Sequence, residues 1–273
     1  HVKNNLEEIQ TLTRQEITGF NPNGGGTITW AKEGKPIGSF YLIKTDGLFQ
    51  SEEEIRNYTN SEGKIIQPKA KPGDVKFVDY NGDGQINASD QQYCGNPFPK
   101  LNMGLTLTGV YKGIDLNLFF DGNFGNKVFN SMRYSTSYMQ NGITNVSADV
   151  LNEWREDNRN TTMPRYTAND ENQNNQAITD RWLENGSFFR LKTLELGYTF
   201  PSVWTDKIKF QKIRIYTAME NLFMATKYKG YNPDLGVNTS SVANQDDMVM
   251  ARGCDPGRYP TPRTFTFGLQ VNF

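Results

Sequence analysis

The sequence is poor in the residues that build metal-dependent and nucleophilic active sites. Its only histidine is His1, and its two cysteines are Cys94 and Cys254. Histidine-based triads and histidine-ligated metal sites are therefore nearly excluded, and two thiols are too few for a zinc site or a disulfide framework. The two cysteines could form one bridge, but the sequence does not supply the Cα separation that a bridge requires.

Net charge and long apolar runs are also lacking. Lysine and arginine number 29 against 30 aspartates and glutamates, so the net charge is −1 and there is no basic footprint for nucleic acid. No segment approaches the ~18 consecutive apolar residues of a membrane-spanning helix. This absence does not exclude a membrane protein, because transmembrane β-strands alternate apolar and polar residues and give a weak hydropathy signal.

The C-terminal segment shows the clearest β pattern. Its alternate residues are apolar and share one face of an extended chain: Phe265, Phe267, Leu269, Val271 and Phe273. The residues between them are small or polar and uncharged. A strand of a soluble sandwich alternates in the same way. The uncharged polar face and the terminal aromatic residue favour the last strand of a transmembrane β-barrel.

Two β-hairpins are predicted upstream of this strand. The first joins alternating apolar residues in 101–107 to those in 114–120 through a tight turn at Lys112–Gly113. The second joins Leu191–Phe200 to Lys209–Asn221. Within its first arm the apolar alternation slips between Leu191 and Leu194, which predicts a bulge there.

Short and long connections alternate along the chain. Lys112–Gly113 and Pro201–Lys207 are short, whereas polar segments of approximately 46–100, 123–187 and 227–262 are long. Loops of that length are uncommon in compact soluble domains. They are typical of a barrel with short turns on one side of the membrane and long extracellular loops on the other.

Some local structure is expected within and before the long segments. Thr27–Ala31 and Ile37–Ile43 are weaker strand candidates, and the acidic run 52–54 is expected to open a short surface helix. Ser147 is expected to cap a second helix with Val150, Leu151 and Trp154 on one side.

Residues 79–90 follow the spacing of a calcium-binding loop. Oxygen ligands at positions one, three, five and twelve, with a backbone carbonyl at position seven, can surround a hard cation, and Gly84 at position six permits the sharp turn. The candidate ligands are Asp79, Asn81, Asp83, the Gln85 carbonyl and Asp90. No helix is predicted before the loop, so a structural Ca²⁺ is favoured over a sensor. An Asx-rich turn without metal would also contain these Asn-Gly and Asp-Gly pairs.

Several blocks occur in an order that resembles the C-terminal part of SusC/RagA-like TonB-dependent transporters of Bacteroidetes outer membranes. Each block is weakly specific alone, and their ordered conjunction carries the resemblance. The blocks are Glu33–Tyr41, Thr45–Gln50, Gly73–Phe77 with the 79–90 loop, Gly95–Lys100, Trp154–Arg165, Gly186–Lys192, Leu196–Pro201, Glu220–Phe223, Tyr228–Asp234 and Tyr259–Phe273.

The resemblance implies an all-β fold: the C-terminal segment of a large antiparallel transmembrane β-barrel of about 22 strands. Roughly seven of those strands are expected in residues 1–273. The family's plug domain and its TonB-contacting segment would lie outside this chain. The implied activity is TonB-dependent import of oligosaccharides or oligopeptides across the bacterial outer membrane. A SusD-like surface lipoprotein would act as a lid.

The resemblance also implies roles for particular residues. The strand from Phe265 to Phe273 would carry the outer-membrane assembly signal. The aromatic residues of the long segments would help to line the outer mouth, although girdle aromatics look the same in sequence. These aromatics are Trp154, Tyr166, Trp182, Tyr228 and Tyr231. Substrate-binding residues are not identified by any motif.

Two other classes of protein fit parts of the sequence. A secreted calcium-binding adhesin or carbohydrate-binding β module would explain the 79–90 loop and the aromatics, but not the alternation of short and long connections. A hydrolase with a carboxylate pair is compatible with 30 acidic residues. No acidic pair stands apart from ordinary surface charge, however, so we expect that the chain is not an enzyme.

Overall fold

The computed structural model describes residues 26–32, 34–137, 145–167, 169–175, 178–236 and 250–273. Parts of the predicted loops 123–187 and 227–262 lie outside these ranges. The chain divides into two compact units, formed by the described parts of two sets of segments. The sheet unit comprises Pro99–Asn126, Asn185–Asp234 and Arg258–Phe273, and the mixed unit comprises His1–Phe98, Lys127–Glu184 and Leu235–Gly257.

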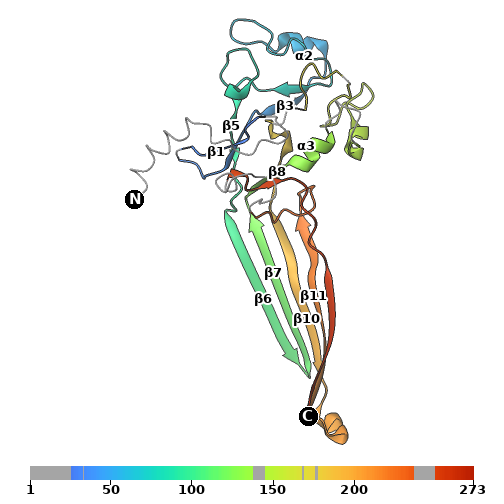
Figure 1. The fold of residues 1–273 in the computed structure, drawn as a ribbon. Helices are drawn as coiled ribbons and strands as arrows, with labels where there is room; N and C mark the ends of the chain where they lie inside the picture. Colours follow the sequence, from blue (N-terminus) through green and yellow to red (C-terminus); the bar gives the residue numbers. More distant parts are fainter. Residues whose placement is uncertain (1–25, 33, 138–144, 168, 176–177, 237–249) are drawn as a thin grey trace. The chain divides into compact units, whose positions relative to one another are not determined.

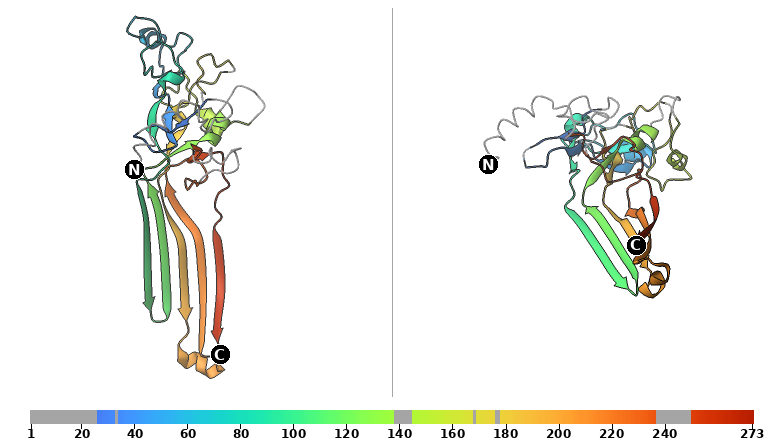
Figure 2. Two further views of the ribbon diagram at one scale, coloured as in Figure 1. Left: turned by 60° about the vertical axis from the view of Figure 1, so that its left-hand side comes forward. Right: turned by 60° about the horizontal axis from the view of Figure 1, so that its bottom comes forward.

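The sheet unit is built on five long antiparallel strands in the order β13-β11-β10-β7-β6 (Figures 1 and 2). Their bounds are β6 (Leu101–Tyr111), β7 (Ile114–Phe124), β10 (Phe188–Thr199), β11 (Lys212–Thr226) and β13 (Thr264–Asn272). Two short helices, α4 (Ser202–Thr205) and η5 (Asp206–Ile208), connect β10 to β11. The all-β, antiparallel fold class is confirmed.

The first predicted hairpin forms as expected. Tyr111 pairs with Ile114, so the connection is the two residues Lys112 and Gly113. Both have positive φ, 47° and 85°, as a type I′ turn requires. A Cβ atom on Gly113 would lie 2.6 Å from the Thr199 carbonyl oxygen, so this position also needs glycine for space.

The second predicted hairpin also forms, with a helical connection in place of a tight turn. Strand β10 pairs with β11 on one side and with β7 on the other. Both registers shift between Leu191 and Thr193, which confirms the predicted bulge. On the partner strand, Asn221 adopts φ 53°, a left-handed conformation that asparagine tolerates well.

The mixed unit contains short strands and helical turns. Its elements are β1 (Thr29–Trp30), β2 (Ser39–Leu42), β3 (Thr45–Leu48), α2 (Glu52–Asn57), β4 (Val75–Phe77), η2 (Ala88–Asp90), β5 (Gln92–Gly95), β8 (Lys127–Asn130), α3 (Ser131–Ser137), η3 (Ala148–Asn152), η4 (Asp180–Trp182), β9 (Leu183–Asn185) and β12 (Cys254–Asp255). They form the sheets β1-β2-β5, β12-β8-β9 and β3-β4. The weaker strand candidates therefore form β1 and β2 of a small separate sheet. The long sheet has five strands within the described ranges, against the roughly seven expected.

The helix predictions are met in part. Helix α2 begins after Ser51, whose hydroxyl accepts a hydrogen bond from the Glu54 amide. Ser147 caps η3, but this element is a 3₁₀-helix that buries Val150 and leaves Leu151 79% exposed. None of the helices in the described ranges is long and apolar enough to cross a bilayer.

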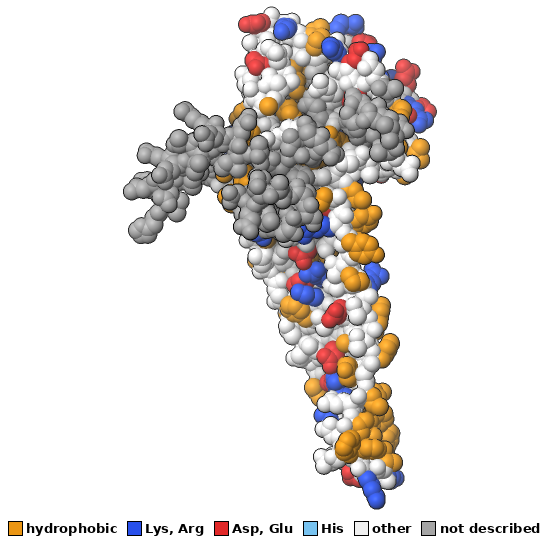
Figure 3. Space-filling view, viewed as in Figure 1, with side chains coloured by type: hydrophobic (Ala, Val, Ile, Leu, Met, Phe, Trp, Pro, Cys, Tyr) orange, Lys and Arg blue, Asp and Glu red, His pale blue; other side chains and the backbone are white. Residues whose placement is uncertain are grey.

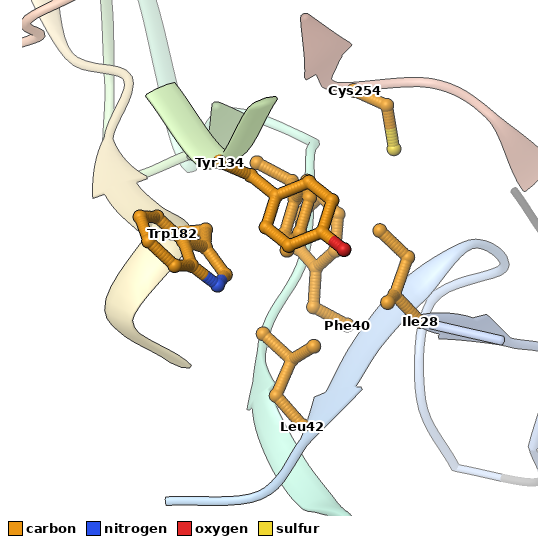
Figure 4. Close-up of a cluster of buried hydrophobic side chains, with 7 residues drawn as sticks. Ile28, Phe40, Leu42, Tyr134, Trp182 and Cys254 are labelled. Atoms are coloured by element: carbon orange, nitrogen blue, oxygen red, sulfur yellow. The ribbon is translucent and has the colours of Figure 1, made fainter. Parts of the chain in front are cut away.

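The largest apolar cluster of the mixed unit gathers side chains from segments far apart in the sequence (Figure 4). Tyr134 from α3 packs edge-on against Trp182, with ring centroids 5.5 Å apart. Phe40 and Leu42 from β2 complete this side of the cluster, and both are fully buried. Cys254 belongs to the same cluster. A core built from such distant segments makes these residues a folded unit and not a set of independent loops.

Replacing Trp182 with alanine is expected to lower the free energy of unfolding of the mixed unit by about 3–5 kcal/mol, because the cavity cannot be filled by its neighbours. Hydrogen exchange of the β2 and β8 amides should show reduced protection. The exposed Leu151→Ala is the control, with an expected change within about 0.5 kcal/mol. Equal protection in both variants would show that this cluster does not hold the unit together.

Candidate functional site

The register of the sheet unit places apolar residues from all five strands on one face. Directly paired residues of antiparallel strands lie on the same face. One such row runs across the whole sheet, through Leu107, Leu118, Leu194, Met219 and Phe265. We call this side the apolar face.

The apolar face is exposed along much of its length. Figure 3 shows hydrophobic side chains along one border of the sheet and at its lower end, with charged side chains on the part turned to the viewer. Soluble monomers rarely expose contiguous apolar patches larger than a few hundred Å². The large exposed residues of this face are Leu101, Met103, Leu105, Leu107, Tyr111, Ile114, Leu116, Leu196, Ile215, Phe223, Phe265, Phe267 and Leu269. Such a face requires an apolar environment.

The opposite face of the sheet carries two ion-pair networks. In the first, Arg190 on β10 donates two hydrogen bonds to Asp121 on β7, at 2.7 and 2.6 Å. The same guanidinium reaches Asp234 at 2.9 Å. The side chain of Arg190 is only 7% exposed, so its charge is matched almost entirely within the protein.

The second network lies closer to the turn at Lys112–Gly113. Arg214 on β11 donates to both carboxylate oxygens of Asp115 and, at 2.7 Å, to Glu195. A Cβ atom on Gly197 would meet both Asp115 and Arg214 at 2.5 Å, so the absence of a side chain there makes room for this ion pair. The bidentate arrangement fixes the side chains of three neighbouring strands in one geometry.

The sheet is thus a wall with an apolar side and a charged, polar side. Charged groups are costly in an apolar phase, and exposed apolar groups are costly in water. The arrangement fits a boundary between a lipid phase and a polar compartment. In the sequence, the signal for this network is a charged residue between two apolar neighbours of a strand. Asp115, Glu195 and Arg214 all stand in such positions.

Both edges of this wall are open in the described part of the chain. Strand β6 pairs only with β7, and β13 pairs only with β11. Unpaired backbone N–H and C=O groups cost several kcal/mol each in an apolar phase. The wall therefore needs further strands at its two edges to close.

Four of the five predicted assembly-signal residues share the apolar face at the β13 edge. Phe265, Phe267 and Leu269 are exposed by 53%, 80% and 66%. Val271 is half-buried and pairs with Ile213. Phe273 follows the end of the strand, is 88% exposed and packs edge-on against Phe210. The shared face is confirmed for the four residues within the strand, and the role of all five in assembly stays a prediction.

The 79–90 segment of the mixed unit forms a tightly hydrogen-bonded loop. The Asp79 carboxylate accepts hydrogen bonds from the amides of Gly82 and Gly84, both at 2.8 Å. The fully buried Asp90 accepts from the Tyr80 and Asn87 amides at 3.0 and 2.8 Å.

The middle of the loop is held in the same way. Asp83 accepts from the Gln85 amide at 2.8 Å and from the Asn81 side chain at 2.9 Å, while the Asn81 side-chain oxygen accepts from the Asp83 amide. Within the described ranges, no three His, Cys, Asp or Glu side chains are grouped closely enough to hold a metal ion. The loop fold is therefore set by backbone hydrogen bonds to these carboxylates, and Ca²⁺ binding stays a prediction.

Both cysteines are free thiols in the mixed unit. Cys254 is buried in the cluster around Trp182, and Cys94 packs against that cluster. Burial raises the pKa of each thiol above its ordinary value, so both are neutral at pH 7. Neither has the lowered pKa of a reactive nucleophile.

The aromatic residues expected at the outer mouth divide into buried and exposed groups. Trp154, Trp182 and Tyr228 are 7%, 1% and 6% exposed, so the prediction that they line an open surface is wrong. Trp154 instead donates a hydrogen bond from its indole nitrogen to Gln50, at 3.0 Å. Tyr166 and Tyr231 are 51% and 57% exposed and remain available for contacts. Core packing, which has no local sequence signal, determines which of these aromatic residues are buried and which are exposed.

Comparison with known proteins gives one consistent result. No protein-family profile matches the chain. Two TonB-dependent receptors of Formosa agariphila are 32% and 30% identical to it, over 89% and 88% of this chain. The TonB-dependent receptor SusC of Bacteroides thetaiotaomicron is 27% identical over 77% of the chain. The chain spans about a fifth to a quarter of the length of these relatives, 23%, 23% and 19% in that order.

Solved structures share the fold. The chain matches the RagAB peptide transporter with a TM-score of 0.65 and 24% identity, covering 93% of this chain and 24% of the other. It matches the open-open state of the RagAB peptide importer with a TM-score of 0.62, again at 24% identity with the same coverage. The amphipathic sheet and its open edges are thus explained as one sector of a larger antiparallel barrel.

Arg190→Met is expected to destabilise the sheet by about 3 kcal/mol, because it leaves the Asp121 and Asp234 carboxylates without their shared cation. The measurement is the temperature at which the folded full-length receptor loses its compact gel mobility. Lys192→Met is the matched control: Lys192 is half-exposed and lies 3.7 Å from Asp121, so a change within about 1 kcal/mol is expected. Equal shifts for the two variants would contradict the assigned role of Arg190.

Proposed function

The chain belongs to the SusC-like TonB-dependent receptors, and from this membership we propose that it forms part of the barrel wall of an active importer in a bacterial outer membrane. The cargo is an oligosaccharide or an oligopeptide, and uptake is driven by TonB. The observation that carries the proposal is the exposed apolar face on all five strands, opposite two ion-paired networks.

The names of the relatives support this class of function. The curated relatives are named as TonB-dependent receptors, and the matched structures as a peptide transporter and a peptide importer. A transport role agrees with a polar face whose cations are held by neighbouring carboxylates. In this proposal the apolar face contacts outer-membrane lipid, the polar face borders the barrel lumen, and the chain has no catalytic role.

The proposal extends to segments 46–100, 123–187 and 227–262. We place them on the extracellular side, where the mixed unit would contribute to the mouth of the barrel and a SusD-like lipoprotein would close over it. The exposed rings of Tyr166 and Tyr231 are the side chains that we propose for contacts with cargo or lid. The TonB contact would be made by the part of the receptor that lies outside this sequence.

The membrane location and the transport are tested together. The full-length receptor should remain with the outer membrane after high-salt and alkaline washing, and uptake of labelled oligopeptides or oligosaccharides should require both the receptor and TonB. A secreted calcium-binding adhesin would be released by the wash. Retention without any TonB-dependent uptake would refute import while leaving the barrel intact.

We also propose that β13 guides assembly through its free edge and its apolar face. Deleting Phe273 should reduce membrane insertion several-fold in a pulse-chase assay, because the exposed ring at the end of the strand would be lost to the insertion machinery. Phe223→Ala on β11 is the control, since Phe223 is also an exposed apolar-face phenylalanine but lies on an interior strand. Unchanged insertion of the Phe273 deletion would remove the assembly role.

The 79–90 loop is proposed to bind a structural Ca²⁺ through Asp79, Asn81, Asp83, the Gln85 carbonyl and Asp90. Calorimetric titration of the full-length receptor with Ca²⁺ should give heat that Asp83→Ala removes. Asp46→Ala is the control, because Asp46 also belongs to the mixed unit and pairs with Lys76 outside the loop. The same heat in wild type and Asp83→Ala, or none in either, would leave the loop as a hydrogen-bonded turn.

A further inference from the structure

The apolar face carries a groove at the end of the sheet with the short connections. Its volume is about 820 Å³, within the roughly 300–1,000 Å³ of typical small-molecule sites. The walls are formed by apolar-face side chains of four strands, β7, β10, β11 and β13. Among them are Ile114, Leu196, Ile215, Phe267 and Leu269.

The floor of the groove is a row of paired residues that place no side chain on the apolar face. Gly197, Tyr216 and Gly268 pair directly across β10, β11 and β13 and belong to the polar register. A Cβ atom on Gly268 would lie 2.2 Å from the ring of Tyr216, so that ring covers the glycine on the polar side. The groove therefore has an almost purely apolar lining, suited to a hydrocarbon chain.

An aromatic ladder leads from the groove to the connection between β10 and β11. Tyr198 lines the groove, and its ring lies edge-on to Phe200 with centroids 5.1 Å apart. Phe200 in turn contacts Trp204, with centroids 6.3 Å apart. Trp204 is 58% exposed, and its neighbours Val203 and Ile208 are 67% and 56% exposed. Exposed tryptophan beside exposed aliphatic residues is typical of the membrane–water interface.

The polar groups at this end are mainly cationic. Lys112 occupies the turn between β6 and β7, while Lys207 and Lys209 lie in the connection between β10 and β11. All three side chains belong to exposed residues. Asp206 is the one acidic residue in these two connections. The charge at the end of the groove therefore complements an anionic headgroup.

We propose that this groove is a binding site for an anionic phospholipid of the inner leaflet, with an acyl chain between β7 and β13 and the phosphate at Lys112, Lys207 and Lys209. The site rests on the proposed function, because only a membrane-embedded sheet meets phospholipid here. It goes beyond general contact with lipid, since it selects for headgroup charge and fixes one chain at one place.

The test uses the full-length receptor in vesicles of phosphatidylcholine with a minor fraction of brominated lipid. Bromine quenches nearby tryptophan, and Trp204 is the reporter; its signal is the difference between the receptor and its Trp204→Phe variant. The fraction of brominated phosphatidylglycerol that half-quenches Trp204 should be about fivefold lower than the fraction of brominated phosphatidylcholine that gives the same quenching. That ratio corresponds to the contribution of about one surface lysine.

Two sets of variants separate headgroup and chain recognition. Replacing Lys112, Lys207 and Lys209 with glutamine should abolish the preference for phosphatidylglycerol. Thr217→Phe should fill the groove, since Thr217 lines it beside Phe267, and weaken quenching by both lipids. Leu105→Phe on β6 is the matched control on the apolar face outside the groove, and should leave quenching unchanged.

Each contrary result overturns the site. Equal quenching by the two lipids would show ordinary annular lipid without selection. No quenching by either lipid would show that another protein or a second copy covers the groove. A receptor that stays in the outer membrane but shows no preference refutes the lipid site alone, whereas release from the membrane by alkaline washing refutes the proposed function itself.

Discussion

A backbone amide or carbonyl in an apolar phase must find its hydrogen-bond partner within the protein, and the sheet unit is organised around this constraint. The interior strands β7 and β10 are paired on both sides, and β11 is paired on both sides over Lys212–Glu220, so most of their backbone groups are satisfied across the wall. The same antiparallel pairing locks the register. Because side chains alternate along each strand, a fixed register gives the wall one apolar face and one polar face.

The polar face shows how charges are accommodated in such a wall. Arg190 and Arg214 each hold two carboxylates, and each pairs residues from different strands or segments. Such pairs contribute little net stability compared with apolar packing, but losing one partner leaves a charge uncompensated. The main effect of these ion pairs is therefore to fix the positions of the side chains and strands that they join. The contact of Arg190 with Asp234 also fixes the segment that follows β11 against the polar face.

The mixed unit is held together by a different principle. Its strands are short, so backbone pairing alone could not order them. Small apolar cores and buried polar contacts supply the rest. Asp74 is fully buried, pairs with Arg165 at 2.6 Å and accepts a hydrogen bond from Asn174 at 2.9 Å. Asn174 in turn accepts from the Val75 amide at 2.7 Å, so residues near 165–174 are joined to β4.

The two ends of the sheet strands differ in the length and composition of the segments that connect the strands. At the end with the short connections, a two-residue turn and a short helical connection present lysines and exposed aromatic residues. Bulky apolar side chains cluster there around the paired row of Gly197, Tyr216 and Gly268, none of which places a side chain on the apolar face, and this leaves room for a hydrocarbon chain. At the other end, long segments provide enough chain to build separate cores. This difference follows the alternation of short and long connections in the sequence.

The sequence by itself determined the sheet wall, because period-two alternation and turn chemistry are local signals. Alternation predicted the shared face of the C-terminal strand, the Lys112–Gly113 pair predicted a tight turn, and the slip after Leu191 predicted the bulge. The fold class followed from these features and from the resemblance. Only the tertiary structure decided which charges pair, as Arg190 does with Asp121 and Asp234. It also decided that Trp154 and Trp182 are buried, and that β1 and β2 form a small separate sheet with β5. Those outcomes depend on contacts between residues tens of positions apart, for which a single sequence holds no local pattern.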